Sequence, residues 1–312
     1  MNTPRLLIYH RYAKLYEEII RKGLPQVNLC AAARPEEAFP FVEEAEIIFS
    51  STRIPDEVLR KARRLRWFAS TLAGNEALVQ NPLLPESVIL TKTTVYGEMM
   101  AEYVFTYLLS IIRNVSIHQE DQRNKAWNPS KPGRLRGKTM GILGLGSVGK
   151  VIAERGRQFG MKVLGVKRTP RPVENVDEIF GPEELKRVIP RVDYLVSVLP
   201  LTPATRHFLK EPELRMLKDD AILFNLGRGQ VIDEEALIRV LKTKRMRAVL
   251  DVFETEPLPP ESELWSLENA VITPHVSGIS IPEEVGGEFI ANYERWVKGE
   301  PLPAVVDRRI GY

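Results

Sequence analysis

The sequence predicts an α/β protein with two doubly wound, parallel-sheet domains. Short apolar runs alternate with helix-like segments along the whole chain, and the alternation begins afresh after a proline- and glycine-containing loop at residues 128–133. The length of 312 residues also favours two domains over one. Hydrophobic residues make up 44% and charged residues 27%, which is ordinary for globular proteins.

The apolar runs form two series of predicted strands. The first series comprises residues 6–9, 47–49, 67–69 and 88–90, with a helical pattern at 56–63 between them. The second series has six strands, the number in a full dinucleotide-binding fold. They are residues 140–143, 163–166, 194–198, 221–224, 248–250 and 271–272.

Two longer helical patterns complete the predicted organisation. One runs from about residue 98 to 123, and the other spans residues 282–297 near the end of the chain. Because the second fold is complete by residue 272, we expect the last helix to return to the first domain. The sequence therefore predicts a discontinuous domain of residues 1–97 and 280–312, and a second domain of residues 98–279.

The charge balance and the cysteine content limit the kinds of partner that the chain is expected to bind and the cellular compartment in which it is expected to occur. The 44 Lys and Arg residues balance 41 Asp and Glu residues, so no nucleic-acid partner is expected. Cys30 is the only cysteine, which excludes an internal disulfide and a cysteine-type zinc site, and we expect no metal. Residues 1–10 lack a signal-peptide pattern, and the apolar stretch 103–112 is too short to span a bilayer. We therefore expect a cytoplasmic protein without membrane contact.

A glycine-rich loop lies between the first strand of the second series and the following helix. Gly144, Gly146 and Gly149 form the pattern GxGxxG, in the strand-to-helix context that a dinucleotide-binding loop requires. Free N–H groups near Ser147 and Val148 are expected to bind a pyrophosphate. The alternative is a tight turn without a ligand.

The residues about twenty positions beyond the glycines predict which dinucleotide is bound. An acidic side chain is usual there in proteins that bind the 2′-hydroxyl of NAD. This chain instead has Lys167, Arg168 and Thr169, followed by Arg171. Cations and a hydroxyl suit a 2′-phosphate, so we expect NADP(H) to be preferred over NAD(H). The alternative is that these side chains only face solvent and both dinucleotides are used.

Polar residues follow three later strands and suit carbonyl reduction. Arg228, Asp251 and His275 each come shortly after a strand, and Glu254 and Glu256 follow Asp251. An arginine can clamp a carboxylate through two hydrogen bonds, and a histidine can donate a proton to a carbonyl oxygen. Singly, each residue could be structural. His10, His118 and His207 lack such a context and are expected to be structural or surface residues.

Five motifs, in this order, resemble the D-isomer-specific 2-hydroxyacid dehydrogenase family. They are the glycine loop, Val-Leu-Pro-Leu-Thr-Pro-Ala-Thr at 198–205, Asn-Leu-Gly-Arg-Gly at 225–229, Asp-Val-Phe-Glu-Thr-Glu-Pro at 251–257, and Thr-Pro-His at 273–275. The resemblance implies a Rossmann dinucleotide-binding domain plus a flavodoxin-like substrate domain. It also implies an enzyme that transfers a hydride between a nicotinamide dinucleotide and a small 2-keto or 2-hydroxy acid.

The resemblance assigns roles by position. Arg228 would bind substrate, Glu256 would pair with His275 as the acid/base, and the backbone at Ala73 and Gly74 would bind the substrate carboxylate. The family's loop commonly reads Gly-Val-Asp, where this chain has Gly74-Asn75-Glu76. The implied cofactor contacts beyond the glycine loop are Leu199, Pro200, Thr205, Leu226, Gly227, Asp251, Ser277 and Gly278.

Within the family the cationic residues after Val166 look like those of NADPH-dependent glyoxylate/hydroxypyruvate reductases, which are generally homodimers. Trp127 is similar to an aromatic residue in the region that reaches across their dimer, or it packs a loop. Two alternatives remain: an NAD-dependent enzyme for a lactate-like acid or phosphoglycerate, and a weakly catalytic dinucleotide sensor. Sustained turnover would distinguish an enzyme from a sensor.

Overall fold

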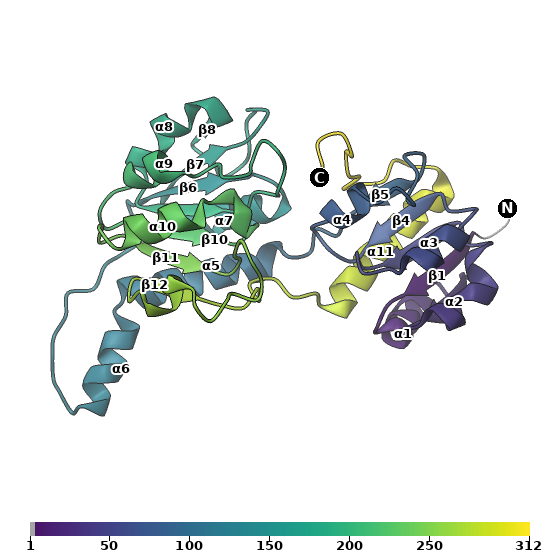
Figure 1. Ribbon diagram of the computed structural model, residues 1–312, viewed down its shortest axis with the longest axis horizontal. Helices are drawn as coiled ribbons and strands as arrows, with labels where there is room; N and C mark the ends of the chain where they lie inside the picture. Colours follow the sequence, from purple (N-terminus) through teal and green to yellow (C-terminus); the bar gives the residue numbers. More distant parts are fainter. Residues whose placement is uncertain (1–3) are drawn as a thin grey trace. The chain divides into compact units, whose positions relative to one another are not determined.

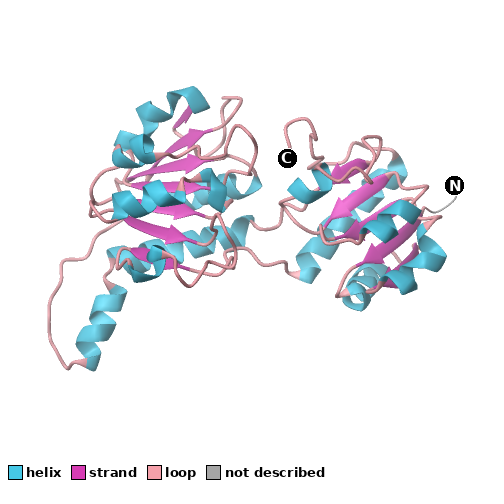
Figure 2. Cartoon of the chain, in the orientation of Figure 1, coloured by secondary structure: helices cyan, strands magenta, loops and turns pink. Residues whose placement is uncertain are grey.

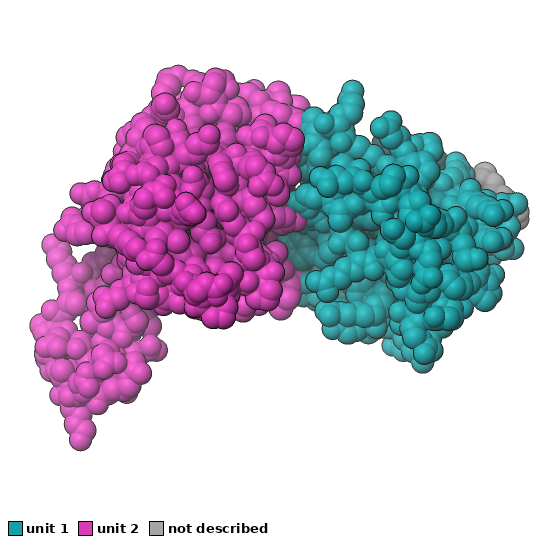
Figure 3. All heavy atoms as spheres, viewed as in Figure 1, with its two compact units in different colours: residues 1–96, 280–312 teal, residues 97–279 magenta. Residues whose placement is uncertain are grey.

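The computed structural model describes residues 4–312, so the first three residues of the predicted first domain lie outside the described residues. The chain folds into two compact units (Figure 3). Unit 1 comprises Met1–Tyr96 and Ser280–Tyr312, and unit 2 comprises Gly97–Ile279. Each unit has its own parallel sheet, as the fold class predicts (Figure 2).

Unit 1 contains a five-stranded parallel sheet in the order β2-β1-β3-β4-β5, which is the flavodoxin-like arrangement. All four predicted strands are present, and β2 is an additional one. The strands are β1 Arg5–Tyr9, β2 Asn28–Ala32, β3 Ile47–Ser50, β4 Trp67–Ser70 and β5 Ile89–Thr91. The helices are α1 Ala13–Gly23, α2 Pro35–Val42, α3 Asp56–Lys61, α4 Glu76–Val79 and α11 Pro282–Lys298.

The last helix, α11, packs into the core of unit 1, as predicted from the completed second fold (Figure 1). Its Phe289 ring stacks on Trp67 with 5.3 Å between ring centroids and lies 4.7 Å from Phe49. Burying large aromatic side chains on one face of the sheet gives a strong hydrophobic gain. A separate apolar cluster, which includes Phe68 and Ile48, covers the opposite face.

Unit 2 contains a seven-stranded parallel sheet in the order β12-β11-β10-β9-β6-β7-β8. The six predicted strands are all present, and β8 is an additional one. The seven strands are β6 Thr139–Leu143, β7 Lys162–Val166, β8 Glu178–Phe180, β9 Tyr194–Ser197, β10 Ile222–Asn225, β11 Arg247–Leu250 and β12 Ala270–Ile272. The α-helices between them are α7 Ser147–Gln158, α8 Leu185–Val188, α9 Glu211–Arg215 and α10 Glu234–Leu241, and short 3₁₀ turns occur at Pro182–Glu184, Ile189–Arg191, Gly229–Val231 and Glu263–Ser266.

The sheet of unit 2 is all parallel, but the chain order of its strands changes direction across the sheet between β6 and β9. Strands β7 and β8 lie on one side of β6, and β9 to β12 lie on the other. In such sheets, ligands bind at the carboxyl ends of the strands near this reversal. The glycine loop follows β6 directly, so the fold places it at that point.

The helical segment predicted at 98–123 is not continuous, and the prediction of one long helix was wrong. It is divided into α5 Gly97–Ile112 and α6 Val115–Arg123 by Asn114, whose φ of 55° lies in the left-handed region that asparagine tolerates. Helix α6 buries none of its residues and extends away from the body of unit 2 (Figure 1).

No helix within residues 4–312 is long and apolar enough to cross a membrane. Nor does that part of the chain hold a cluster of three or more His, Cys, Asp or Glu side chains that could bind a metal ion.

Candidate active site

Strand register brings the predicted catalytic loops to one edge of the sheet in unit 2. Asn225 pairs with Leu250, and Leu250 pairs with Ile272, so β10, β11 and β12 end side by side. Arg228 follows β10, Asp251 and Glu256 follow β11, and His275 follows β12.

The side chains of His275 and Glu256 are in direct contact at this edge of the sheet. The Nδ1 atom of His275 lies 2.8 Å from Oε2 of Glu256, and both side chains are partly exposed. The other carboxylate oxygen, Oε1, accepts a hydrogen bond from the backbone N–H of Phe253 at 3.1 Å. Glu256 is therefore oriented by its own loop. A carboxylate at Nδ1 fixes the tautomer of a histidine ring and leaves Nε2 as the nitrogen that could exchange a proton.

Asp251 organises the loop that carries His275. Its side chain is fully buried, and its oxygens accept hydrogen bonds from the Thr273 hydroxyl at 2.6 Å and from the N–H groups of Val276 and Ser277 at 2.8 Å. The backbone N–H of His275 also donates to the Asp251 carbonyl at 2.9 Å. This network holds His275 with a φ of 55°, a backbone conformation that is strained for a residue with a side chain.

Arg228 is half-buried, and its turn packs against the loop of Glu256. The guanidinium donates to the Gly227 carbonyl at 2.8 Å, and the Asn225 amide donates to the Arg228 carbonyl at 3.1 Å. A Cβ at Gly229 would lie 1.9 Å from the carbonyl carbon of Phe253. Only glycine permits this approach, so the turn of Arg228 is locked against the residues that position Glu256.

His207 contributes a contact that the sequence did not predict. Its Nε2 lies 2.9 Å from Oε1 of Glu254, two residues before Glu256 in the same loop. Glu254 and Glu234 also exchange hydrogen bonds, because the N–H of each donates to the carboxylate of the other at 3.1 and 3.3 Å. Burial, followed by the neighbouring Glu254 charge, raises the pKa of Glu234. His207 is therefore tied to the active-site loop rather than lying free on the surface.

The glycine loop has the geometry of a phosphate cradle. Gly144 adopts a φ of 99°, and a Cβ at Gly149 would lie 2.0 Å from the Gly144 carbonyl oxygen. A Cβ at Gly146 would meet nothing within 4 Å, so that side of the loop is open. The first N–H groups of α7, at Ser147 and Val148, have no partner inside the helix. These features fit a dinucleotide pyrophosphate.

The predicted adenosine- and nicotinamide-side residues lie on adjacent loops. A Cβ at Gly227 would come within 2.3 Å of the Leu199 carbonyl oxygen, so the loops after β9 and β10 touch. The Thr205 hydroxyl donates to the Pro200 carbonyl at 2.6 Å and shapes the first loop. Two buried polar atoms at this edge, Ser197 Oγ and Asn225 Oδ1, have no hydrogen-bond partner among the described residues, which fits an edge that receives a polar ligand. Leu226 is buried, Ser277 is 2% exposed and Gly278 is half-buried.

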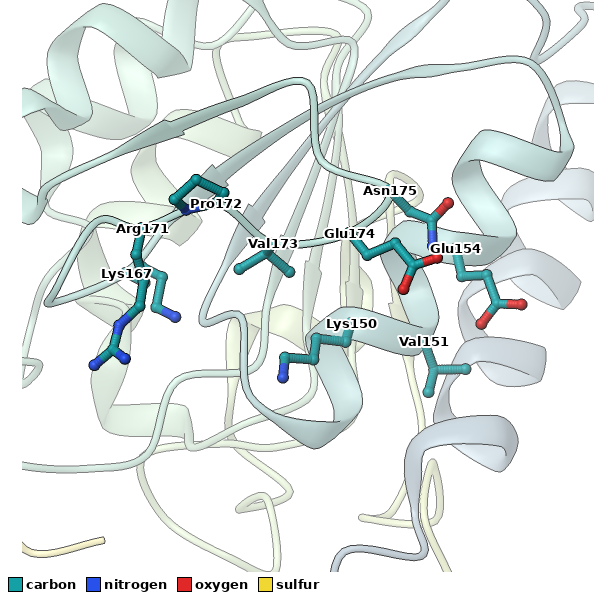
Figure 4. A pocket seen from close by; sticks show the side chains of 9 residues that line it. All are labelled: Lys150, Val151, Glu154, Lys167, Arg171, Pro172, Val173, Glu174 and Asn175. Carbon is teal, nitrogen blue, oxygen red and sulfur yellow. The ribbon is translucent and has the colours of Figure 1, made fainter.

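A cavity of about 410 Å³ lies beside the glycine loop (Figure 4). Lys167 and Arg171 line it, and so does Lys150 on α7, which the sequence analysis missed; Arg168 and Thr169 are not among its lining residues. Burial, then the charges of Arg171 and Lys150, lower the pKa of Lys167. Lys150 was missed because a single exposed lysine on a helix resembles any solvated residue.

Ala73 and Gly74 belong to unit 1, in the loop between β4 and α4. The Asn75 side chain is buried, and its amide lies 3.1 Å from the Leu72 carbonyl and 3.4 Å from the Ala73 carbonyl. The Tyr96 hydroxyl donates to the Thr71 carbonyl at 3.1 Å. These contacts fix the loop and leave Ala73 exposed.

Fold and site together define an α/β oxidoreductase with a dinucleotide-binding sheet. Residues 105–277, more than half of the chain, match the model of the NAD binding domain of D-isomer specific 2-hydroxyacid dehydrogenases. The chain belongs to this family, and as a member it is an NAD(P)-dependent dehydrogenase or reductase.

Individual relatives agree with this assignment. The chain is 32% identical to the glyoxylate/hydroxypyruvate reductase A of Serratia proteamaculans, over 83% of this chain and 86% of the relative. A family member of known structure from Aeromonas salmonicida is 37% identical, with a TM-score of 0.89 over 98% of this chain and 100% of that one. Another, from Xanthobacter autotrophicus in complex with NADPH and MES, is 30% identical, with a TM-score of 0.90 and full coverage of both chains.

Proposed function

We propose that this protein reduces a small 2-keto acid, with glyoxylate or hydroxypyruvate as substrate and NADPH as the preferred reductant. The observation that carries the proposal is the 2.8 Å contact between His275 and Glu256, at the strand ends that also carry Arg228. A relative that bears the name glyoxylate/hydroxypyruvate reductase supports the substrate class.

The proposed roles follow from the chemistry of carbonyl reduction. The guanidinium of Arg228 binds the substrate carboxylate and polarises the adjacent carbonyl. His275, protonated on Nε2, donates a proton to the carbonyl oxygen as negative charge develops there. Glu256 orients the ring through its contact with Nδ1. The bound reduced nicotinamide supplies the hydride.

We further propose that unit 1 supplies a substrate-binding loop and that unit 2 binds the dinucleotide. Backbone N–H groups at Ala73 and Gly74 would bind the substrate carboxylate. The glycine loop would bind the pyrophosphate, Leu199, Pro200 and Thr205 would contact the adenosine side, and Leu226, Gly227, Asp251, Ser277 and Gly278 would lie toward the nicotinamide. Asp251 would act there mainly through the loop that it holds.

Residues 167–169 are proposed to give the protein a preference for NADP(H), and NAD(H) is proposed as a second, weaker cofactor. The cation-lined cavity supports a 2′-phosphate at this place, and the relative bound to NADPH shows that the family includes NADPH-binding members. Thr169 would add a hydroxyl donor beside Lys167 and Arg168.

The active form is proposed to be a cytoplasmic homodimer. In support, Trp127 is 95% exposed in the loop after α6, and Val115 and Ile117 on α6 are also exposed. Apolar side chains on a segment that buries nothing of its own suit contact with a second copy. Light scattering after size-exclusion chromatography tests this: a dimeric mass that becomes monomeric in Trp127→Asp supports it, and a monomeric wild type contradicts it.

The activity itself is tested by following the oxidation of NADPH and of NADH with glyoxylate, hydroxypyruvate, pyruvate and a bulkier 2-keto acid. The proposal expects the highest kcat/KM with NADPH and a small keto acid. Turnover mainly with NADH would keep the reaction class and contradict the cofactor preference. Dinucleotide binding without turnover on any of these acids would contradict the proposed reaction.

A further inference from the structure

The cavity beside the glycine loop gathers positive charge from two separate elements. Lys150 projects from the first turn of α7, while Lys167 and Arg171 come from the end of β7 and the loop after it (Figure 4). The cavity also has two acids in its lining, Glu154 and Glu174. The ion pairs found within residues 4–312 include Glu154 with Arg155 at 3.2 Å, but none of them involves Lys150, Lys167 or Arg171.

These three cations interact unfavourably with one another in the absence of an anion. The charges of Arg171 and Lys150 contribute to lowering the pKa of Lys167, after the larger effect of burial. Like charges that face a common cavity lower their repulsion when an anion enters it. The arrangement therefore favours a dianionic group over a neutral hydroxyl.

The position of the cavity relates it to the ribose of a bound dinucleotide. Lys150 directly follows Gly149, so it lies within one turn of the N–H groups that fit the pyrophosphate. The N–H of Gly144 donates to the carbonyl of Val166 at 3.0 Å, which joins the glycine loop to the residue before Lys167. In this fold, the residue at the end of that strand contacts the ribose 2′-position.

We propose that Lys150 is a cofactor-specificity residue that binds the 2′-phosphate of NADPH from the α7 side of the cavity, opposite Lys167 and Arg171. The inference rests on the proposed NADPH preference and adds a residue that no motif of the sequence identified. Arg171, which lines the same cavity, acts with Lys150.

The test measures binding and needs no turnover. Isothermal titration calorimetry of the whole chain compares 2′,5′-ADP with 5′-AMP, which differs from it only by lacking the 2′-phosphate, for wild type and for Lys150→Met. Methionine keeps the length of the side chain and removes its charge. Lys22→Met, on the surface of unit 1, is the control for an equal change in net charge, and Lys150→Arg tests whether charge alone restores binding.

We expect Lys150→Met to weaken the binding of 2′,5′-ADP about tenfold, through the loss of one charge-assisted contact, and to leave the binding of 5′-AMP nearly unchanged. Lys22→Met should change neither, and Lys150→Arg should retain most of the preference. Equal weakening of both ligands, or no weakening, overturns the role of Lys150. If the wild type itself binds both ligands equally, the proposed NADPH preference is wrong and the role of Lys150 fails with it. A preference that depends on Lys150 in a protein without reductase activity would instead contradict only the proposed reaction.

Discussion

Nδ1 of His275 lies 2.8 Å from a carboxylate oxygen of Glu256, whose second oxygen is bound by the N–H of Phe253. The pair is therefore prepared before any substrate arrives, because the carboxylate is already oriented by its own loop. The turn of Arg228 packs against the same loop through Gly229, so the proposed acid/base pair and the proposed carboxylate-binding residue share one support.

Glu256→Gln should lower kcat for keto-acid reduction about tenfold to hundredfold, because a hydrogen bond to a charged group contributes about 1.5–3 kcal/mol. The amide replaces one carboxylate oxygen with an N–H₂ group, so the contact that fixes the tautomer of His275 is weakened. Steady-state kinetics of keto-acid reduction in both proteins measure kcat and KM. An unchanged kcat would show that the contact of Glu256 with His275 does not support the reaction.

The glycine loop offers a matched pair of substitutions. Gly146→Ala should fold with an unchanged Tm and bind NADPH weakly, because a Cβ there meets nothing in the protein but blocks the approach of the phosphates. Gly149→Ala should instead destabilise the fold, since its Cβ would lie 2.0 Å from the Gly144 carbonyl oxygen. Thermal unfolding and NADPH titration distinguish the two effects. Full affinity in Gly146→Ala would place the dinucleotide elsewhere.

Loss of the contact between the His207 ring and Glu254 should lower kcat, although the His207 side chain is partly exposed. His207→Asn tolerates the left-handed backbone, where φ is 49°, but its shorter side chain loses the contact with Glu254. We expect kcat to fall severalfold while the Kd for NADPH stays unchanged. His207→Gln, with a longer amide, should recover part of the loss. If kcat and Kd are both unaffected in His207→Asn, the contact does not stabilise the loop of Glu256.

His10 in unit 1 should make stability fall under mildly acidic conditions. Burial, followed by the charge of Arg11, lowers the pKa of His10 from 6.5 to about 4. The unfolded chain therefore binds a proton at a higher pH than the folded one, so stability is lost as pH falls from 6.5 toward 4. Urea denaturation of wild type and His10→Gln at pH values above and within this window measures the effect. The acid-induced loss should be smaller in the variant, and an equal loss in both proteins would contradict the prediction.

Local patterns were sufficient to predict the fold class and most strands, because apolar runs such as that of β9 are buried on both faces. Strand β2 was missed since Asn28, Cys30 and its alanines do not form a strongly apolar run, and β8 begins at a charged residue, Glu178, so its apolar run is only Ile179 and Phe180. The break at Asn114 depends on one left-handed residue within an otherwise helical pattern.

The candidate site likewise has one part that the sequence was sufficient to predict and other parts that it was not. The glycine loop could be predicted because its geometry depends on neighbours in sequence. The contact of His207 with Glu254 joins residues 47 positions apart, and the convergence of Lys150 with Lys167 depends on how α7 packs beside β7. Neither relationship leaves a periodic or compositional signal.

If His275 is the acid/base of a keto-acid reductase, single-turnover reduction of glyoxylate by NADPH should be much slower in His275→Ala than in wild type. We expect a rate lower by about 10²-fold or more, which is the range for general acid catalysis, with unchanged affinity for NADPH. A variant that binds NADPH and reduces glyoxylate at the wild-type rate would contradict this role for His275.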